Sequence, residues 1–264
     1  MTGTYIPITI VQLCLAASLI LINVGLSIAF RLGLEKSLGI ATVRMTVQLL
    51  LVGYVLNWIF SVDSPWLVLS VAFVMSAIAG QAAVHRTRRR FVGIYWNAFG
   101  SILVSSAFVT GLLIAGILRI EPWYTPQYVV PLLGMVLGNT LTGTSLALDR
   151  FMEELVHRRL QVESLLALGA TRWEAARETL QESLRTGMIP TINSMMVVGL
   201  VSLPGMMTGQ ILGGVAPTDA VRYQIVIFFT IAAGTALACM GVILLAFRVL
   251  FNANHQLCLD RLEK

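Results

Sequence analysis

Long apolar runs separated by short polar connections make up most of the chain. Each run is close to the 20 or so residues that a helix needs to cross the hydrocarbon core of a bilayer. Lipid offers backbone groups no hydrogen bonds, so runs of this length are expected to form helices. Seven spans are predicted: Pro7–Phe30, Ala41–Phe60, Trp66–Val84, Ile94–Leu118, Tyr128–Leu148, Met188–Gly213 and Tyr223–Phe247. The pattern therefore predicts an all-α, polytopic membrane protein.

Composition agrees with this class. Hydrophobic residues make up 57% of the chain and charged residues 12%, whereas a soluble domain carries roughly 25% charged residues. No phosphate-binding loop and no long polar segment interrupts the spans, so we expect a single transmembrane domain over residues 1–264 without an ATPase site. An intramembrane hydrolase built on Ser145 is not favoured, because His85, His157 and His255 fall in polar connections beyond a serine's reach.

The basic residues predict the orientation. If Met1 lies outside, 16 of the 18 Lys and Arg residues fall on the cytosolic side, and Arg119 and Arg222 are the exceptions. Cytosolic loops carry an excess of basic residues, so we expect the N-terminus outside and the C-terminus in the cytosol. The run Arg86–Arg90 borders a span and is interpreted as part of this signal, so the net charge of +5 is not taken to indicate nucleic acid.

One cytosolic connection, residues 150–187, is large enough to form structure of its own. A helical segment ends at Gly169, and Thr171 stands three residues before Glu174, the spacing of a capping box at a new helix start. The new helix carries an apolar stripe on a helical period: Trp173, Ala176, Leu180 and Leu184. We expect a helix-turn-helix that presents a surface to a soluble partner.

The fifth span is polar in its cytosolic half. Asn139, Thr142 and Ser145 share a helix face, and Gly134 and Gly138 form a G-x-x-x-G pair that lets helices approach closely. Polar side chains at this depth must meet another helix or a wet cavity. Two interpretations stay open: they hold helices together, or they line a transport pathway.

The sixth span is interrupted near its outer end by Pro204–Gly205, which removes a backbone donor. Freed backbone groups at membrane depth are tolerated where they are buried or line a cavity. The distinctive side chains nearby are Asn193, Ser194, Met195, Met196, Met206 and Met207. Methionines fill irregular cores, and they also ligate soft metals, so a metal site stays undecided.

Arg44 and Gln48 lie one helical turn apart in the second span. Arg44 can extend to the cytosolic interface, or it can face an inner vestibule and attract anions. The span interiors hold no Asp or Glu, although a cation-coupled carrier normally needs an intramembrane carboxylate or histidine. Residue chemistry therefore argues against a pore for bare cations.

The cytosolic connection resembles the coupling loop of ABC-importer permeases, whose pattern is E-A-A-x-x-x-G-A-[ST]-x-W. Glu163, Gly169–Thr171 and Trp173 match this pattern, whereas Ser164 and Leu165 replace its two alanines. The resemblance implies that the loop docks in a groove of an ATPase. The residues expected to couple are Glu163, Gly169, Ala170, Thr171, Trp173 and Leu180.

Nearly end to end, the chain is similar to the FetB family of small seven-span permeases, which is related to the membrane subunits of plant aluminium-tolerance half-transporters. The matching segments are Arg44, Gln48–Leu49, Gly53–Leu56, Gly138–Asn139, Leu168–Thr171, Val198–Met207 (VGLVSLPGMM), Ile211 and Arg222–Gln224. The resemblance implies a separate FetA-type ATPase that binds ATP and Mg²⁺, a second permease copy and a bacterial inner membrane. It implies no cofactor in this chain. Bacterial members are associated with iron export and plant members with nucleotide sugars.

These observations favour a permease subunit that exports iron or another metal. Export of a nucleotide sugar or another anion is the first alternative, and a stand-alone carrier or channel with a regulatory loop is the second. Candidate pathway residues are Arg44, Gln48, Asn139, Thr142, Ser145, Asn193, Met196, Pro204, Met206 and Met207.

Overall fold

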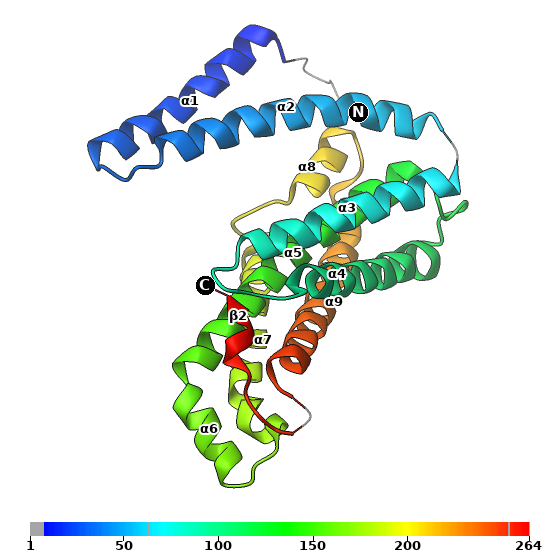
Figure 1. Cartoon of the computed structure of the whole chain (residues 1–264). Helices are drawn as coiled ribbons and strands as arrows, with labels where there is room; N and C mark the ends of the chain where they lie inside the picture. The colour runs from blue at the N-terminus through cyan, green and yellow to red at the C-terminus, as the bar shows by residue number, and fades with distance from the viewer. Residues whose placement is uncertain (1–7, 63, 253, 264) are drawn as a thin grey trace.

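The computed structural model describes residues 8–62, 64–252 and 254–263, and this part of the chain is almost entirely helical (Figure 1). The predicted start of the first span at Pro7 and the side assigned to Met1 lie outside the described residues. The elements are α1 (Ile10–Ala29), α2 (Glu35–Phe60), α3 (Pro65–His85), β1 (Arg90–Phe91), α4 (Ile94–Gly111), the π-helical η1 (Leu112–Leu118), α5 (Pro126–His157), α6 (Arg159–Ala167), α7 (Arg172–Val197), α8 (Gly205–Leu212), α9 (Pro217–Leu250), the 3-10 turn η2 (Leu259–Arg261) and β2 (Leu262–Glu263).

Among the described residues, six helical stretches are long and apolar enough to cross a membrane: α1, α2, α3, α4 with η1, α5 and α9. Each corresponds to a predicted span, so the prediction of an all-helical, polytopic membrane protein is confirmed. The ends differ from the prediction. Helix α5 continues past Leu148 to His157, because the polar residues after Leu148 sustain the helix beyond the apolar run.

The predicted sixth span, Met188–Gly213, is not one helix and is not among the six. Helix α7 ends at Val197, and α8 starts only at Gly205. The prediction placed the interruption at Pro204–Gly205, whereas the chain leaves the helix at Val198, with Gly199 in the left-handed region at φ 85°. Glycine adopts this conformation without strain, and the residue before a proline avoids the helical region.

Helix α5 lies at the centre of the bundle and packs against α3, α4, α7 and α9 (Figure 1). It meets α7 where Gly143 and Gly187 face each other. A Cβ added to Gly187 would lie 2.7 Å from Ala147 Cβ and 2.9 Å from Cys239 Sγ. Gly134 and Gly138 were predicted as a pair that lets helices approach closely. A Cβ on Gly134 would lie 3.4 Å from Met75 Cε of α3, whereas a Cβ on Gly138 meets nothing within 4 Å in the described chain, so only Gly134 faces a neighbouring helix there.

Helices α1 and α2 form a hairpin that stands away from this bundle (Figure 1). Ser27 stabilises the turn between the two helices. Its hydroxyl donates a hydrogen bond to Glu35 Oε1 at 2.9 Å and accepts one from the Leu34 amide at 3.0 Å. None of the most apolar stretch of α2 is buried. The hairpin therefore offers an apolar surface to lipid or to another protein.

The C-terminal tail closes the opposite end of the bundle. Its strand β2 pairs antiparallel with β1, which precedes α4. Leu257 and Leu259 of the tail pack against a buried cluster that contains Phe91, Phe247 and Phe251. This cluster supports the start of α7.

Candidate functional site

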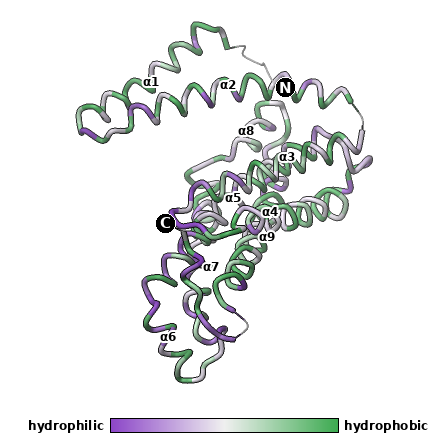
Figure 2. Tube along the Cα trace, viewed as in Figure 1, coloured by the Kyte–Doolittle hydropathy of each residue, from purple (hydrophilic) through white to green (hydrophobic). Residues whose placement is uncertain are grey.

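Helix α6 and the first turns of α7 form a helix-turn-helix that projects at one end of the molecule (Figure 1). Hydrophilic residues gather at this end, whereas α1–α4 and α9 are mostly hydrophobic (Figure 2). We call residues 158–184 the coupling element. It coincides with the predicted helix-turn-helix in residues 150–187.

The turn of the coupling element is fixed by its backbone. Gly169 takes the left-handed conformation at φ 93°. Its amide donates to Leu166 O at 3.1 Å, and the Ala170 amide donates to Leu165 O at 3.0 Å. This pair of bonds is a Schellman motif, which satisfies the last carbonyls of α6. The backbone hydrogen bonds therefore define the conformation of the turn.

The predicted capping box at the start of α7 is confirmed. The Thr171 amide donates to Glu174 Oε2 at 2.7 Å, and the Glu174 amide donates to Thr171 Oγ1 at 3.4 Å. The Thr171 backbone and hydroxyl hydrogen bonds hold the pKa of Glu174 below its usual value, because both favour the charged carboxylate. A second anchor is Arg172, whose amide donates to His255 Nδ1 at 3.0 Å and whose guanidinium donates to Asn252 O at 3.1 Å.

Trp173 packs sideways into the bundle. Its ring lies on Phe247, with centroids 4.2 Å apart, and 47% of the residue stays exposed. Glu163 forms an ion pair with Arg159 at 2.7 Å on the outer side of α6. Neither side chain occupies the turn itself.

The most exposed apolar side chains of the coupling element are two leucines that were not among the predicted coupling residues. Leu168 at the turn is 85% exposed and Leu160 on α6 is 79% exposed. Leu168 directly precedes Gly169, and a glycine often ends a helix in a tight turn. This position was the sequence signal that could have identified Leu168 as a residue of the turn. These two leucines are apolar surface that the element presents to its surroundings.

Ion pairs join the coupling element to α5. Glu154 is 5% exposed, and its carboxylate pairs with Arg150 at 2.8 Å and with Arg158. Arg158 also reaches Glu178 on α7 at 2.6 Å. One buried carboxylate thus connects α5 to the start of α6 and, through Arg158, to α7.

A groove between α7 and α9 continues from Trp173. It measures about 340 Å³ and is lined mainly by apolar side chains, with Leu180 and Leu184 on α7 facing Met240 and Leu244 on α9. The predicted coupling residue Leu180 is therefore part of this groove and does not lie at the turn.

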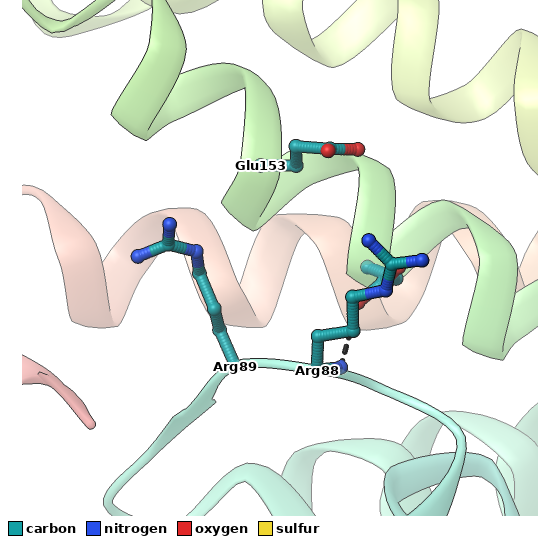
Figure 3. A pocket seen from close by; sticks show the side chains of 4 residues that line it. Arg88, Arg89 and Glu153 are labelled. Atoms are coloured by element: carbon teal, nitrogen blue, oxygen red, sulfur yellow. Dashed lines mark hydrogen bonds between the residues drawn. The ribbon is translucent and has the colours of Figure 1, made fainter. Parts of the chain in front are cut away.

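A charged cavity of about 330 Å³ lies between the α3–α4 connection and α5, lined by Arg88, Arg89, Asp149 and Glu153. Figure 3 shows Arg88 and Arg89 rising from the connection toward α5, where Glu153 lies. The Arg88 amide donates to Asp149 Oδ1 at 2.8 Å. The cavity offers both cationic and anionic groups to a ligand.

The predicted pathway residues of α5 bond to their own helix. Asn139 donates to Met135 O at 2.9 Å, Thr142 to Gly138 O at 3.1 Å and Ser145 to Thr142 O at 3.0 Å. Thr142 Oγ1 also accepts from the Arg86 guanidinium at the end of α3, at 3.4 Å. The three side chains do not form one shared polar network.

The other predicted pathway residues are scattered. Arg44 and Gln48 are exposed on α2, in the separate hairpin, and Asn193 and Met196 are exposed on α7. Met206 packs against the bundle core, and Pro204 immediately precedes α8. The structure thus does not bring the ten residues into one site.

Met207 lines a cavity of about 390 Å³ that opens where α7 is interrupted, which we call the break cavity. Its lining residues are Met195, Val198, Gly199 and Met207 from the α7–α8 segment and Val221, Gln224, Ile225, Phe228 and Phe229 from α9. Gln224 is 6% exposed, and its Oε1 has no hydrogen-bond partner among the described residues. Sequence reasoning did not select Met195 or Gln224 as pathway residues. A glutamine inside an apolar span was the available signal.

Within residues 8–62, 64–252 and 254–263, no group of three or more His, Cys, Asp or Glu side chains is placed to hold a metal ion. Met195 and Met207 line the break cavity with soft sulfur donors.

Fold and sites define a polytopic helical membrane protein with a projecting polar helix-turn-helix. Residues 10–251 match the family described as "Uncharacterised protein family (UPF0014)", and the chain belongs to this family. It is 39% identical to "UPF0014 membrane protein YjkA" of Bacillus subtilis, over 93% of this chain and 97% of that one.

Two further relatives carry names that indicate a biological role. The chain is 33% identical to "Probable iron export permease protein FetB" of Escherichia coli, over 97% of this chain and 98% of that one. It is 32% identical to "Protein ALUMINUM SENSITIVE 3" of Arabidopsis thaliana, over 92% and 87% of the two chains. The resemblance to the FetB family is confirmed. No solved structure matches the chain.

Proposed function

We propose that the chain is the membrane-spanning permease subunit of an ABC transporter and exports iron or another metal. A separate FetA-type ATPase would bind ATP and Mg²⁺, and two copies of this chain would form the pathway in a bacterial cytoplasmic membrane. The N-terminus would lie outside and the C-terminus in the cytosol. The interrupted α7–α8 segment would supply the seventh crossing.

The observation that supports this proposal most strongly is the construction of the coupling element. A Schellman turn and a capping box fix its shape, and Leu160 and Leu168 present exposed apolar side chains. The Glu154 ion pairs connect it to α5, the central helix. A partner that moves the coupling element would therefore also move α5 and α7, because force passes through packed helices and ion pairs.

The name of the Escherichia coli relative supports metal export. The exposed Arg44 favours the second candidate, an anionic substrate such as a nucleotide sugar, because arginine binds phosphate groups well. A stand-alone carrier or channel, with the coupling element as a regulator site, is the candidate of another class.

Binding of the ATPase tests the docking role. We expect Leu168→Asp to weaken binding to the FetA-type ATPase by about 10-fold or more, because a carboxylate replaces a leucine that becomes buried on docking. The affinity would be measured by biolayer interferometry with the chain in nanodiscs. Val92→Asp is the matched control: Val92 is 78% exposed and lies in the β1–α4 connection, away from the coupling element.

Loss of binding in Leu168→Asp with wild-type binding in Val92→Asp would support docking at the turn. Equal binding by all three proteins would show that the ATPase docks elsewhere or that Leu168 is peripheral. If the wild-type chain binds no ATPase, the stand-alone carrier becomes the better account.

A further inference from the structure

We propose that the break cavity binds an uncharged, mainly apolar molecule that carries one hydrogen-bonding group. The cavity's volume of about 390 Å³ falls within the range of small-molecule pockets, roughly 300–1,000 Å³. The claim that this molecule is also the transported substrate rests on the proposed function. The claim that it binds to the chain does not.

The lining excludes charged ligands. None of the nine residues that line the break cavity is ionisable. A charged ligand would leave water without gaining an opposite charge, which is strongly unfavourable in apolar surroundings. A bare metal ion and a nucleoside diphosphate therefore do not fit this cavity. If the protein exports either of them, that substrate passes by another route.

Gln224 specifies the polar part of the ligand. A buried amide oxygen without a partner is unfavourable, and nearly all such groups in folded proteins are paired. The terminal torsion of glutamine is broad and roughly two-fold, so rotation about it can turn either the oxygen or the nitrogen of the amide toward the cavity. One hydroxyl, amine or carbonyl group on a ligand would complete this bonding.

The walls of the cavity can adapt to an apolar body. Met195 and Met207 contribute flexible thioether side chains from opposite sides of the interruption, and Phe228 and Phe229 add aromatic surface from α9. Methionine is common at surfaces that bind varied apolar ligands. Two sources share this chemistry: an organic compound, or a metal ion wrapped in a neutral chelator with an apolar exterior.

Binding is tested on the full chain in nanodiscs without the ATPase. Tritiated 4-pentylphenol is equilibrated with the protein, and uptake by protein-free nanodiscs of the same lipid is subtracted. We expect saturable binding that weakens roughly 10-fold in Gln224→Leu, which keeps an apolar side chain but loses the amide. Pentylbenzene, which has no hydrogen-bonding group, should bind the wild type and Gln224→Leu equally.

A cavity-filling pair of variants locates the site. Met195→Trp should abolish the binding of 4-pentylphenol. Met196→Trp, its neighbour on the same helix with 72% exposure and no place in the cavity, should bind as the wild type does. Thermal melting of each variant shows whether it is folded.

Competition with neutral ferric tris(benzohydroxamate) distinguishes the two sources. If this chelate displaces 4-pentylphenol, the natural ligand is a chelated metal. If it does not, the natural ligand is an organic compound. Absence of saturable binding, or equal binding by Met195→Trp and Met196→Trp, would overturn the proposal, since lipid or a second copy would then cover the cavity. That failure would leave ATPase docking at Leu168 untouched.

Discussion

Trp173 has two surfaces with different roles. One face of its ring packs on Phe247 inside the buried cluster, and the remaining 47% is exposed beside the α7–α9 groove. A residue of this kind fixes the base of the coupling element and can also contact a partner. Stability and ATPase coupling therefore need to be measured on the same variants.

We predict that Trp173→Ala lowers the free energy of unfolding by about 2 kcal/mol, because about half of an aromatic side chain and its ring contact are lost. Trp173→Phe should keep the contact with Phe247 and lose less than half as much. Both values can be measured by chemical denaturation in mixed micelles. Unchanged stability of Trp173→Ala would mean that Phe247 does not support α7.

Local sequence signals predicted the residue-scale features well. The Thr171–Glu174 capping box and the turn at Gly169 depend on side chains within a few positions of each other, so a sequence window contains all the information. The exposure of Leu168 and the unpaired oxygen of Gln224 depend on which segments lie nearby in three dimensions. The sequence signals, a glycine-ended turn and a glutamine in an apolar span, mark these two positions but do not give their surroundings.

Among the elements, the contact of α5 with α7 is the most sensitive to added volume. Gly143 and Gly187 allow backbone-to-backbone packing, with Cys239 of α9 closing the third side. Side chains as small as alanine do not fit here without displacement, since interiors are packed to high density.

We expect Gly187→Ala to destabilise the protein by about 1–3 kcal/mol, because its Cβ would overlap Ala147 and Cys239. Gly138→Ala is the control, since a Cβ there meets nothing within 4 Å in the described chain. Thermal melting in nanodiscs compares the two variants. If Gly138→Ala proves the more destabilised, the close packing lies at Gly138, between copies of the chain, and not at Gly187.

Span prediction succeeded wherever hydrophobicity alone decides, because length and apolar composition are properties of one segment. It misplaced the interruption of the sixth span. Pro204 is the conspicuous helix breaker, yet the helix ends at Val198 and Gly199 carries the left-handed turn. The segment from Val198 to Leu203 contains two valines, a glycine and a serine. None of these residues ends a helix alone, but their low helix propensities add up.

Across the whole molecule, the α1–α2 hairpin is the part that sequence reasoning could not place. Hydropathy predicted both helices, but it says nothing about which helices pack together. Arg44 and Gln48 were expected beside the pathway, and they lie on the hairpin, exposed and apart from the bundle. Polar groups in lipid need partners, so the proposed second copy is where we expect these two side chains to find them.

Transport in sealed vesicles tests the central claim most directly. The chain and its candidate FetA-type ATPase are reconstituted together, and ATP-dependent movement of Fe²⁺, other metals, neutral chelates and nucleotide sugars is measured. The account predicts ATP-driven movement of one of these classes that is lost in Leu168→Asp and kept in Val92→Asp. Movement that proceeds without ATP or the ATPase would contradict it and identify a stand-alone carrier or channel.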